Sequence, residues 1–400
     1  MSNLYALDET LDMLNGTNYT SFEGLAEAVL IESRDFCSFI ESQNIILEKI
    51  DFSKIKEKAK QVWERIKAKI KALIAKIEYF VRELVRKSKK ILLIKKVIPD
   101  KFTLKTAKEC LNEGIKAGFN MRKDLIAQFR GKDNIFDEEG SKEKAEKLMD
   151  EYLKTNPVEV EIIDNSILDE DDTKVVTNFI QHSGEILDKY EENCKNFEKH
   201  SNEFFKSFYS YNELQGLSTV KANTSKSPYG IDNAFEEPRK YLNYNALSKG
   251  ETDSKYFIKL KTPETFTFKK KITINNYDDF ENIKMPTEGV DIYITLLSLK
   301  DKEESLVNNL RLIVKSGDNT INKIKSNLHA GEKDPSLYMR WFIESCTELM
   351  NDGIKFSTTA SHYESYYRKL YNETIQCSIK ISVKMLSLAN ISYNELKKDE

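Results

Sequence analysis

The sequence predicts a mainly α-helical protein: an elongated bundle of coiled-coil-like helices with a small antiparallel β insertion. Two long stretches repeat apolar residues at alternating steps of three and four, which is typical of amphipathic helices. Glycine is scarce, with 14 in 400 residues against a usual ~7%, and this favours helix over tightly turned β structure. The 40% of hydrophobic residues are enough for a core and exclude a wholly disordered chain.

The first fifty residues predict two helices. Leucines at 4, 7, 11 and 14 share one helical face, and Gly16 follows where a helix ends. Thr20 and Glu23 form a capping-box pattern for a second helix that extends to about residue 49. Its apolar face is the set Leu25, Val29, Phe36, Ile40, Leu47 and Ile50.

The strongest pattern covers residues 52–90 and predicts a cationic amphipathic helix. From Ala59 onward its apolar positions follow a strict heptad, while lysines occupy the other faces. An alternative ends this helix earlier and places a short strand at 91–94, and Pro99 closes either version.

Residues 103–212 predict two shorter helices, one strand and a second long helix. Thr103 caps a helix that stops at Gly131, and residues 141–155 form another. Alternation of Val and Ile with Glu at 158–162 predicts a strand. A second heptad seam spans 176–211, and its partner is the basic helix, another helix of this chain or a second subunit.

The C-terminal part predicts a linker, a small sheet and further helices. Residues 213–254 lack a sustained period, and period-two alternation follows at 256–260, 266–268, 272–274 and 290–297. Asp334 and Pro335 begin a helix, and a separate last helix carries Tyr363 to Met385. The expected segments are 1–155 (N-terminal helical), 156–212 (strand and heptad helix), 213–254 (linker), 255–300 (sheet) and 301–400 (C-terminal helices).

Charge is polarised within the first two hundred residues. Successive blocks of fifty carry net charges of -7, +10, +1 and -8. The basic helix therefore has four interpretations: a core helix with a solvated lysine face, a helix bound to an anionic membrane, a contact with nucleic-acid phosphates, or a partner of the acidic helices on either side. Because charge and apolar stripe occupy different faces, these interpretations are compatible.

Two sets of residues are the candidate site. The interaction seam comprises Trp63, Ile66, Ile70, Leu73, Ile77, Phe80, Leu84, Leu187, Tyr190, Phe197, Phe204 and Phe208. The candidate contacts for an anionic partner are Lys67, Lys69, Lys71, Lys76, Arg86, Lys87, Lys89 and Lys90. We expect the seam to be buried against protein and the lysines at 67, 69, 71 and 76 to face solvent or a partner.

Catalytic and metal motifs are not evident in the sequence. The four histidines lack zinc-ligand spacing, the acidic cluster at 164–172 lacks the glycine and terminal glutamate of a calcium loop, and the glycines form no phosphate loop. We therefore expect no enzymatic activity, no cofactor and no small-molecule substrate. Five well-separated cysteines, no signal peptide and no long apolar run indicate a reducing, cytoplasmic location or a place in a virion.

Three stretches carry a resemblance: MSNLYALDETLDMLNG at 1–16, SFEGLAEAVLIES at 21–33 and IKAKIKALIAKIEYFVRELVRK at 66–87. Together they resemble the helical internal or structural virion proteins of large tailed bacteriophages. The resemblance implies a non-enzymatic structural or assembly subunit of an oligomeric particle, with other subunits as partners. A membrane-active protein using the basic helix is the alternative, and a nucleic-acid-contacting protein ranks third.

Overall fold

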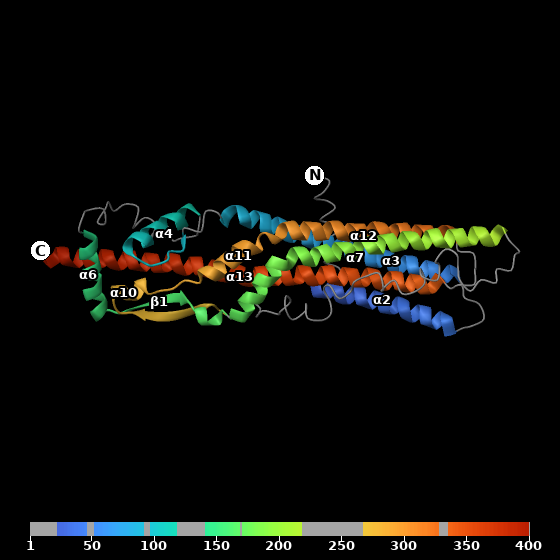
Figure 1. The fold of residues 1–400 in the computed structure, drawn as a ribbon. Helices are drawn as coiled ribbons and strands as arrows, with labels where there is room; N and C mark the ends of the chain where they lie inside the picture. Colours follow the sequence, from blue (N-terminus) through green and yellow to red (C-terminus); the bar gives the residue numbers. More distant parts are fainter. Residues whose placement is uncertain are drawn as a thin grey trace, which may run out of the picture. The chain divides into compact units, whose positions relative to one another are not determined.

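The structure is a computed structural model that describes residues 22–45, 52–91, 97–117, 141–168, 170–217, 267–327 and 335–399. Figure 1 shows its elements in chain order. They are α2 (Phe22–Ile45), α3 (Phe52–Ile91), α4 (Leu104–Lys116), α6 (Ser141–Thr155), β1 (Val158–Ile163), α7 (Glu170–Leu217), β2 (Lys269–Ile274), α10 (Tyr277–Glu281), α11 (Thr287–Leu296), α12 (Leu299–Asn327) and α13 (Pro335–Asp399). Helices hold 85% of the described residues, so the mainly α class with a small sheet is confirmed.

Heptad periodicity located two of the long helices. The predicted basic helix is α3, and the second seam lies in α7. The first turn of α7 carries Glu170, Asp171 and Asp172, where the helix dipole favours negative charge. The predicted helix at 4–14, the strand at 91–94 and most of the 213–254 linker lie outside the described residues.

Capping residues set the beginnings of two short helices. The side chain of Thr103 accepts a hydrogen bond from the Thr106 N–H and begins α4, as predicted. The described part of α4 ends at Lys116, ahead of the expected stop at Gly131. Asn276, which follows β2, caps α10 through the N–H of Asp279.

The sheet pairs two strands that are distant in sequence. β1 runs antiparallel to β2, with Val158 opposite Ile274 and Ile163 opposite Lys269. On its polar side, Glu161 accepts a hydrogen bond from Lys380 of α13. The strand at 158–162 is confirmed, whereas the partner of β2 lies in the first half of the chain and not within 255–300.

Two predicted elements are wrong. Residues 290–297 were expected as a strand, but α11 covers nearly all of them. The buried set Gly289, Val290, Ile292, Tyr293 and Leu296 follows helical spacing more closely than alternation. The two expected C-terminal helices are in fact the single helix α13, which continues through Gly353; a Cβ atom at this glycine would lie 3.2 Å from the Tyr190 hydroxyl.

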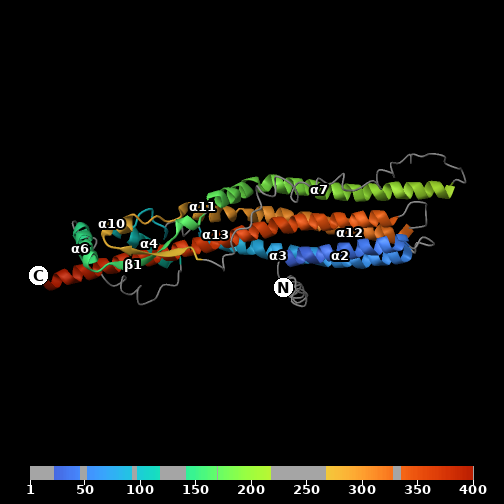
Figure 2. The same ribbon diagram turned by 90° about the horizontal axis from the view of Figure 1, so that it is seen from below.

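The chain forms two compact units, and each combines segments from three parts of the sequence. Unit 1 contains Met1–Glu83, Asn178–Ile258 and Leu299–Ser361, whereas unit 2 contains Leu84–Thr177, Lys259–Ser298 and His362–Glu400. Helices α3, α7 and α13 contribute residues to both units. In unit 1, α2 lies alongside α3, and α12 lies alongside α13 (Figure 2).

Candidate functional site: the basic helix α3 and its partners

The apolar seam of α3 is buried by the chain itself. Trp63, Ile66, Ile70, Leu73 and Ile77 have no exposed surface, and neither has Leu84. Burial of five such side chains contributes ~8–15 kcal/mol before the entropy of ordering, at ~1.5–3 kcal/mol each. The predicted burial of Trp63, Ile70, Leu73 and Ile77 is confirmed, and the core-helix interpretation accounts for it.

Phe80 departs from the predicted seam because it is only half-buried. Its neighbour Val81 is buried in its place, with 7% exposure. Ile77, Val81 and Leu84 follow one another at steps of four and three, which is ordinary helical spacing. The buried stripe therefore stays continuous through Val81, and Phe80 lies at its margin.

Trp63 seats in a notch on α12. A Cβ atom at Gly317 would overlap the six-membered ring of Trp63, so only glycine allows this approach. The indole N–H donates a hydrogen bond to Asp318 Oδ1 at 3.0 Å, and the ring centroid lies 5.8 Å from that of Phe342 on α13. One side chain thus joins three helices of unit 1.

Asp318 also forms an ion pair with a lysine of α3. Lys67 Nζ lies 2.7 Å from its Oδ1 atom. Partial burial opposes ionisation of Asp318, but the hydrogen bonds from Lys67 and Trp63 and the lysine charge hold its pKa below the ordinary value. Lys67, a candidate contact for an anionic partner, is therefore paired with an acid of its own chain.

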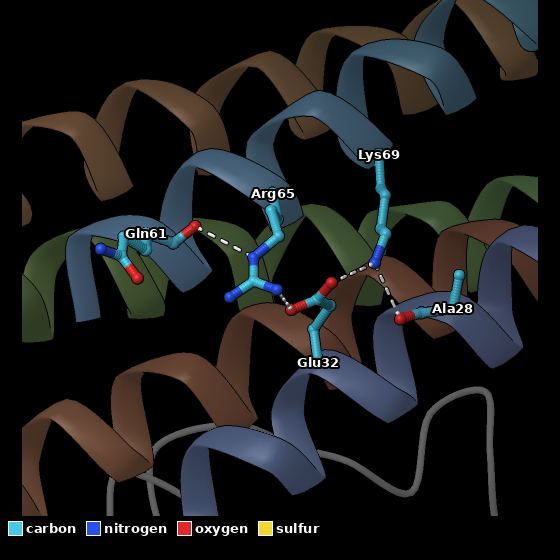
Figure 3. A network of polar contacts seen from close by, with 5 residues as sticks. All are labelled: Ala28, Glu32, Gln61, Arg65 and Lys69. Carbon is cyan, nitrogen blue, oxygen red and sulfur yellow. Dashed lines mark hydrogen bonds and ion pairs between the residues drawn. The ribbon is translucent and has the colours of Figure 1, made fainter. Parts of the chain in front are cut away.

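The side chain of Lys69 extends from α3 towards α2, as Figure 3 shows. Its Nζ atom donates hydrogen bonds to the Ala28 carbonyl at 2.9 Å and to Glu32 Oε1 at 3.1 Å. The second oxygen of Glu32 forms an ion pair with Arg65 Nη1 at 3.3 Å, and Arg65 Nε donates a hydrogen bond to the Gln61 carbonyl of the preceding turn.

Lys69 was expected to face solvent or a partner; it does not face solvent, because it is only 8% exposed, and its partner is Glu32 of the same chain. Desolvation by this burial lowers its pKa, although the hydrogen bond and charge of Glu32 oppose that shift. Periodicity places Lys69 next to the seam position Ile70, at the margin of the apolar stripe. There the acidic helix α2 covers it, as the interpretation that pairs α3 with its acidic neighbours predicts.

The remaining candidate cations have varied environments. Lys87 Nζ binds Glu364 Oε1 of α13 at 2.9 Å within unit 2. Lys71 and Arg86 are exposed, Lys76 is half-buried, and the side chains of Lys89 and Lys90 lie outside the described residues.

The seam of α7 is likewise covered by helices of unit 1. Leu187, Tyr190 and Phe197 are buried, and the Phe197 ring lies 5.4 Å from Phe342. The side chains of Phe204 and Phe208 lie outside the described residues. Among the three possible partners of this seam, the structure supports another helix of the same chain.

Two buried carboxyl groups of unit 1 were missed by the sequence reasoning. Glu303 has no exposed surface and accepts a hydrogen bond from Ser357 at 2.7 Å; burial raises its pKa to about 8. Burial, helped by the charge of Glu348, raises the pKa of Asp352 to about 7. A usable signal existed, because Glu303 occupies a seam position between Leu299 and Leu306.

Metal-binding clusters of three or more His, Cys, Asp or Glu residues are absent from the described part of the chain. Among the same residues, no helix combines the length and the apolar character needed to cross a bilayer. No family model, curated protein or solved structure matches this chain.

Proposed function

We propose that this protein is a non-enzymatic structural subunit of a multi-subunit assembly, such as a virion. The proposal depends on one observation: α3, the helix best suited to bind lipid or nucleic acid, is engaged on both sides by the chain's own helices. Its seam is buried, and Lys67 and Lys69 bind Asp318 and Glu32. A helix held in this way stabilises the fold, and the exposed faces of the surrounding helices are then available to contact other subunits.

The assembly contacts of this proposal differ from those first expected. The described seam residues are already packed within the chain, so a second subunit would meet the outer faces of the helices. Using α3 on a membrane would require exposing the seam, which forfeits the ~8–15 kcal/mol estimated above. This penalty favours the structural role over the membrane-active alternative.

Gentle lysis of the native cells or particles, gel filtration and mass spectrometry of the fractions test the proposal. We expect the chain to elute well above its own 46.4 kDa, together with a constant set of proteins. Elution as a single chain under all mild conditions contradicts the proposal.

Flotation of the purified protein with phosphatidylserine-containing vesicles tests the alternative. We expect no flotation at physiological salt. Flotation that weakens with salt and is lost when exposed Lys60 and Lys71 become glutamate would support the membrane-active alternative instead.

A further inference from the structure

Helix α2 has a face that the packing of unit 1 leaves outward. Its inner face contains Leu25, Ala28, Val29 and Phe36, all buried, and Glu32, which binds α3. The exposed residues form a continuous helical stripe on the other side: Glu27, Leu30, Ile31, Arg34, Asp35 and Ser38. We call this set the α2 stripe.

The centre of the α2 stripe is apolar. Leu30 is 38% exposed and Ile31 is 49% exposed, and only two other large hydrophobic residues, Tyr79 and Ile391, are as exposed in the described part of the chain. Single exposed apolar residues are common on protein surfaces, but two adjacent ones flanked by charges form a small patch.

The charges around this centre are arranged symmetrically. The midpoint of the patch falls between Leu30 and Ile31, and Glu27 lies as far before it as Arg34 lies after it. A second α2 laid antiparallel across this midpoint sets Leu30 against the second copy's Ile31. The same operation sets Glu27 of each copy against Arg34 of the other copy, so two equivalent ion pairs form.

We propose that the α2 stripe docks on a second copy of this chain through an antiparallel, two-fold helix pair centred between Leu30 and Ile31. This inference rests on the proposed assembly function and names one of its contacts. A parallel pair would oppose Glu27 to Glu27 and Arg34 to Arg34, so charge selects the antiparallel arrangement. The stripe is much smaller than the ~800 Å² per partner of a stable dimer, so the contact is weak alone and gains strength where an assembly repeats it.

Cysteine cross-linking distinguishes this arrangement from other contacts. In a Cys37→Ser background, Ile31→Cys places two thiols beside the two-fold axis, whereas Ser38→Cys places them at stripe positions about 22 Å apart along the axis. A disulfide requires Cα atoms within ~7 Å. We expect mild oxidation to link Ile31→Cys into dimers and to leave Ser38→Cys monomeric; equal linking of both variants, or of neither, overturns the proposal.

A charge-swap cycle gives an independent measurement. By sedimentation equilibrium of the full chain, Glu27→Lys or Arg34→Glu alone should weaken self-association by ~2–10-fold, and the double variant should restore it. Tyr79→Ser, which changes an exposed apolar residue on α3, is the control and should have no effect. Double-variant association as weak as that of the single variants contradicts the antiparallel pair.

The outcomes separate this inference from the proposed function. If the high-mass assembly persists unchanged in all α2 variants, the α2 contact is wrong and the assembly role stands. If the native protein elutes alone but the purified chain shows the predicted cross-link and charge-swap pattern, the assembly role is wrong and the α2 contact stands.

Discussion

At the residue scale, two helical glycines of unit 1 have opposite structural roles. A Cβ at Gly317 would overlap the Trp63 ring, which other helices hold in place. A Cβ at Gly184 would instead meet Lys302 Nζ at 3.2 Å, the mobile end of a long side chain. The same substitution therefore tests packing at one site and helix propensity at the other.

Gly317→Ala should destabilise the protein, because overpacking costs ~1–3 kcal/mol and outweighs the ~1 kcal/mol gain in helix propensity. Gly184→Ala should be neutral or stabilising by up to ~1 kcal/mol, because Lys302 can move aside. Urea midpoints from tryptophan fluorescence and circular dichroism measure both. Equal midpoints for the two variants would show that α12 has no notch for Trp63.

Glu303 links the stability of unit 1 to pH. Its pKa is raised to about 8 in the folded state, above the ordinary 4.5, so the folded protein binds a proton more tightly than the unfolded chain. The stability that this proton supports is complete below pH ~4.5 and is lost as pH rises towards 8, at up to ~1.4 kcal/mol per pH unit.

Glu303→Gln keeps the shape and the Ser357 contact without this ionisation. We expect its urea midpoint to match that of the wild type near pH 5 and to exceed it near pH 8. Ser357→Ala is the matched control, since it should retain the pH dependence. A parallel loss of stability with pH in Glu303→Gln and wild type would assign the effect to other groups.

At the element scale, α3 has one face whose residues stabilise the fold and another whose residues face solvent. Ile70→Asp buries a charge in the seam and should destabilise unit 1 by ~4 kcal/mol or more. Lys71→Glu, one residue away and exposed, should leave the melting temperature within ~1–2 °C of the wild-type value.

Lys69→Glu should destabilise unit 1 as Ile70→Asp does, because it places a second carboxylate against Glu32. Thermal melts followed by circular dichroism decide among them, and a wild-type melt for Ile70→Asp would show that the seam does not pack.

Periodicity explains which elements could be predicted. In α3, α7 and β1 apolar residues recur at regular spacing along most of one face, so sequence spacing alone located these elements. It failed at α11, where apolar residues fit both periods, and over α13, where two helices were expected and one is found. The strand partner of β2 and the acid that binds Lys67 lie far away in sequence, and local patterns carry no information about such pairs. The alternation of acidic and basic segments did point to acidic α2 as a partner of α3, where Glu32 binds Lys69.

For the whole molecule, the cysteines report on both units. Cys194 and Cys346 are buried in unit 1, Cys110 and Cys377 are buried in unit 2, and Cys37 is half-buried. Burial raises the pKa of each of the four buried thiols, which suppresses the reactive thiolate.

A thiol reagent added to the native protein should therefore label at most Cys37 quickly, and all five cysteines after denaturation. Mass spectrometry of the labelled peptides over time assigns each rate. If the slow labelling of the unit 1 pair and the unit 2 pair proceeds at different rates, the units open separately. Rapid native labelling of any of the four buried thiols contradicts the described cores.

The covering of α3 by α12 has a consequence for the chain as it is made. The contact of Trp63 with α12 cannot form until Asp318 has been synthesised, and Asp318 lies 255 residues later in the chain. At ~5–20 residues per second, a ribosome needs roughly 13–50 s to synthesise that interval. During this time α12 and α13, which contact Trp63 in the finished protein, have not been made, so the nascent chain exposes apolar surface of α3 that these helices later bury. Chaperones would encounter this apolar surface during translation and not afterwards, whereas exposed cations of α3 such as Lys60 and Lys71 stay accessible in the folded chain.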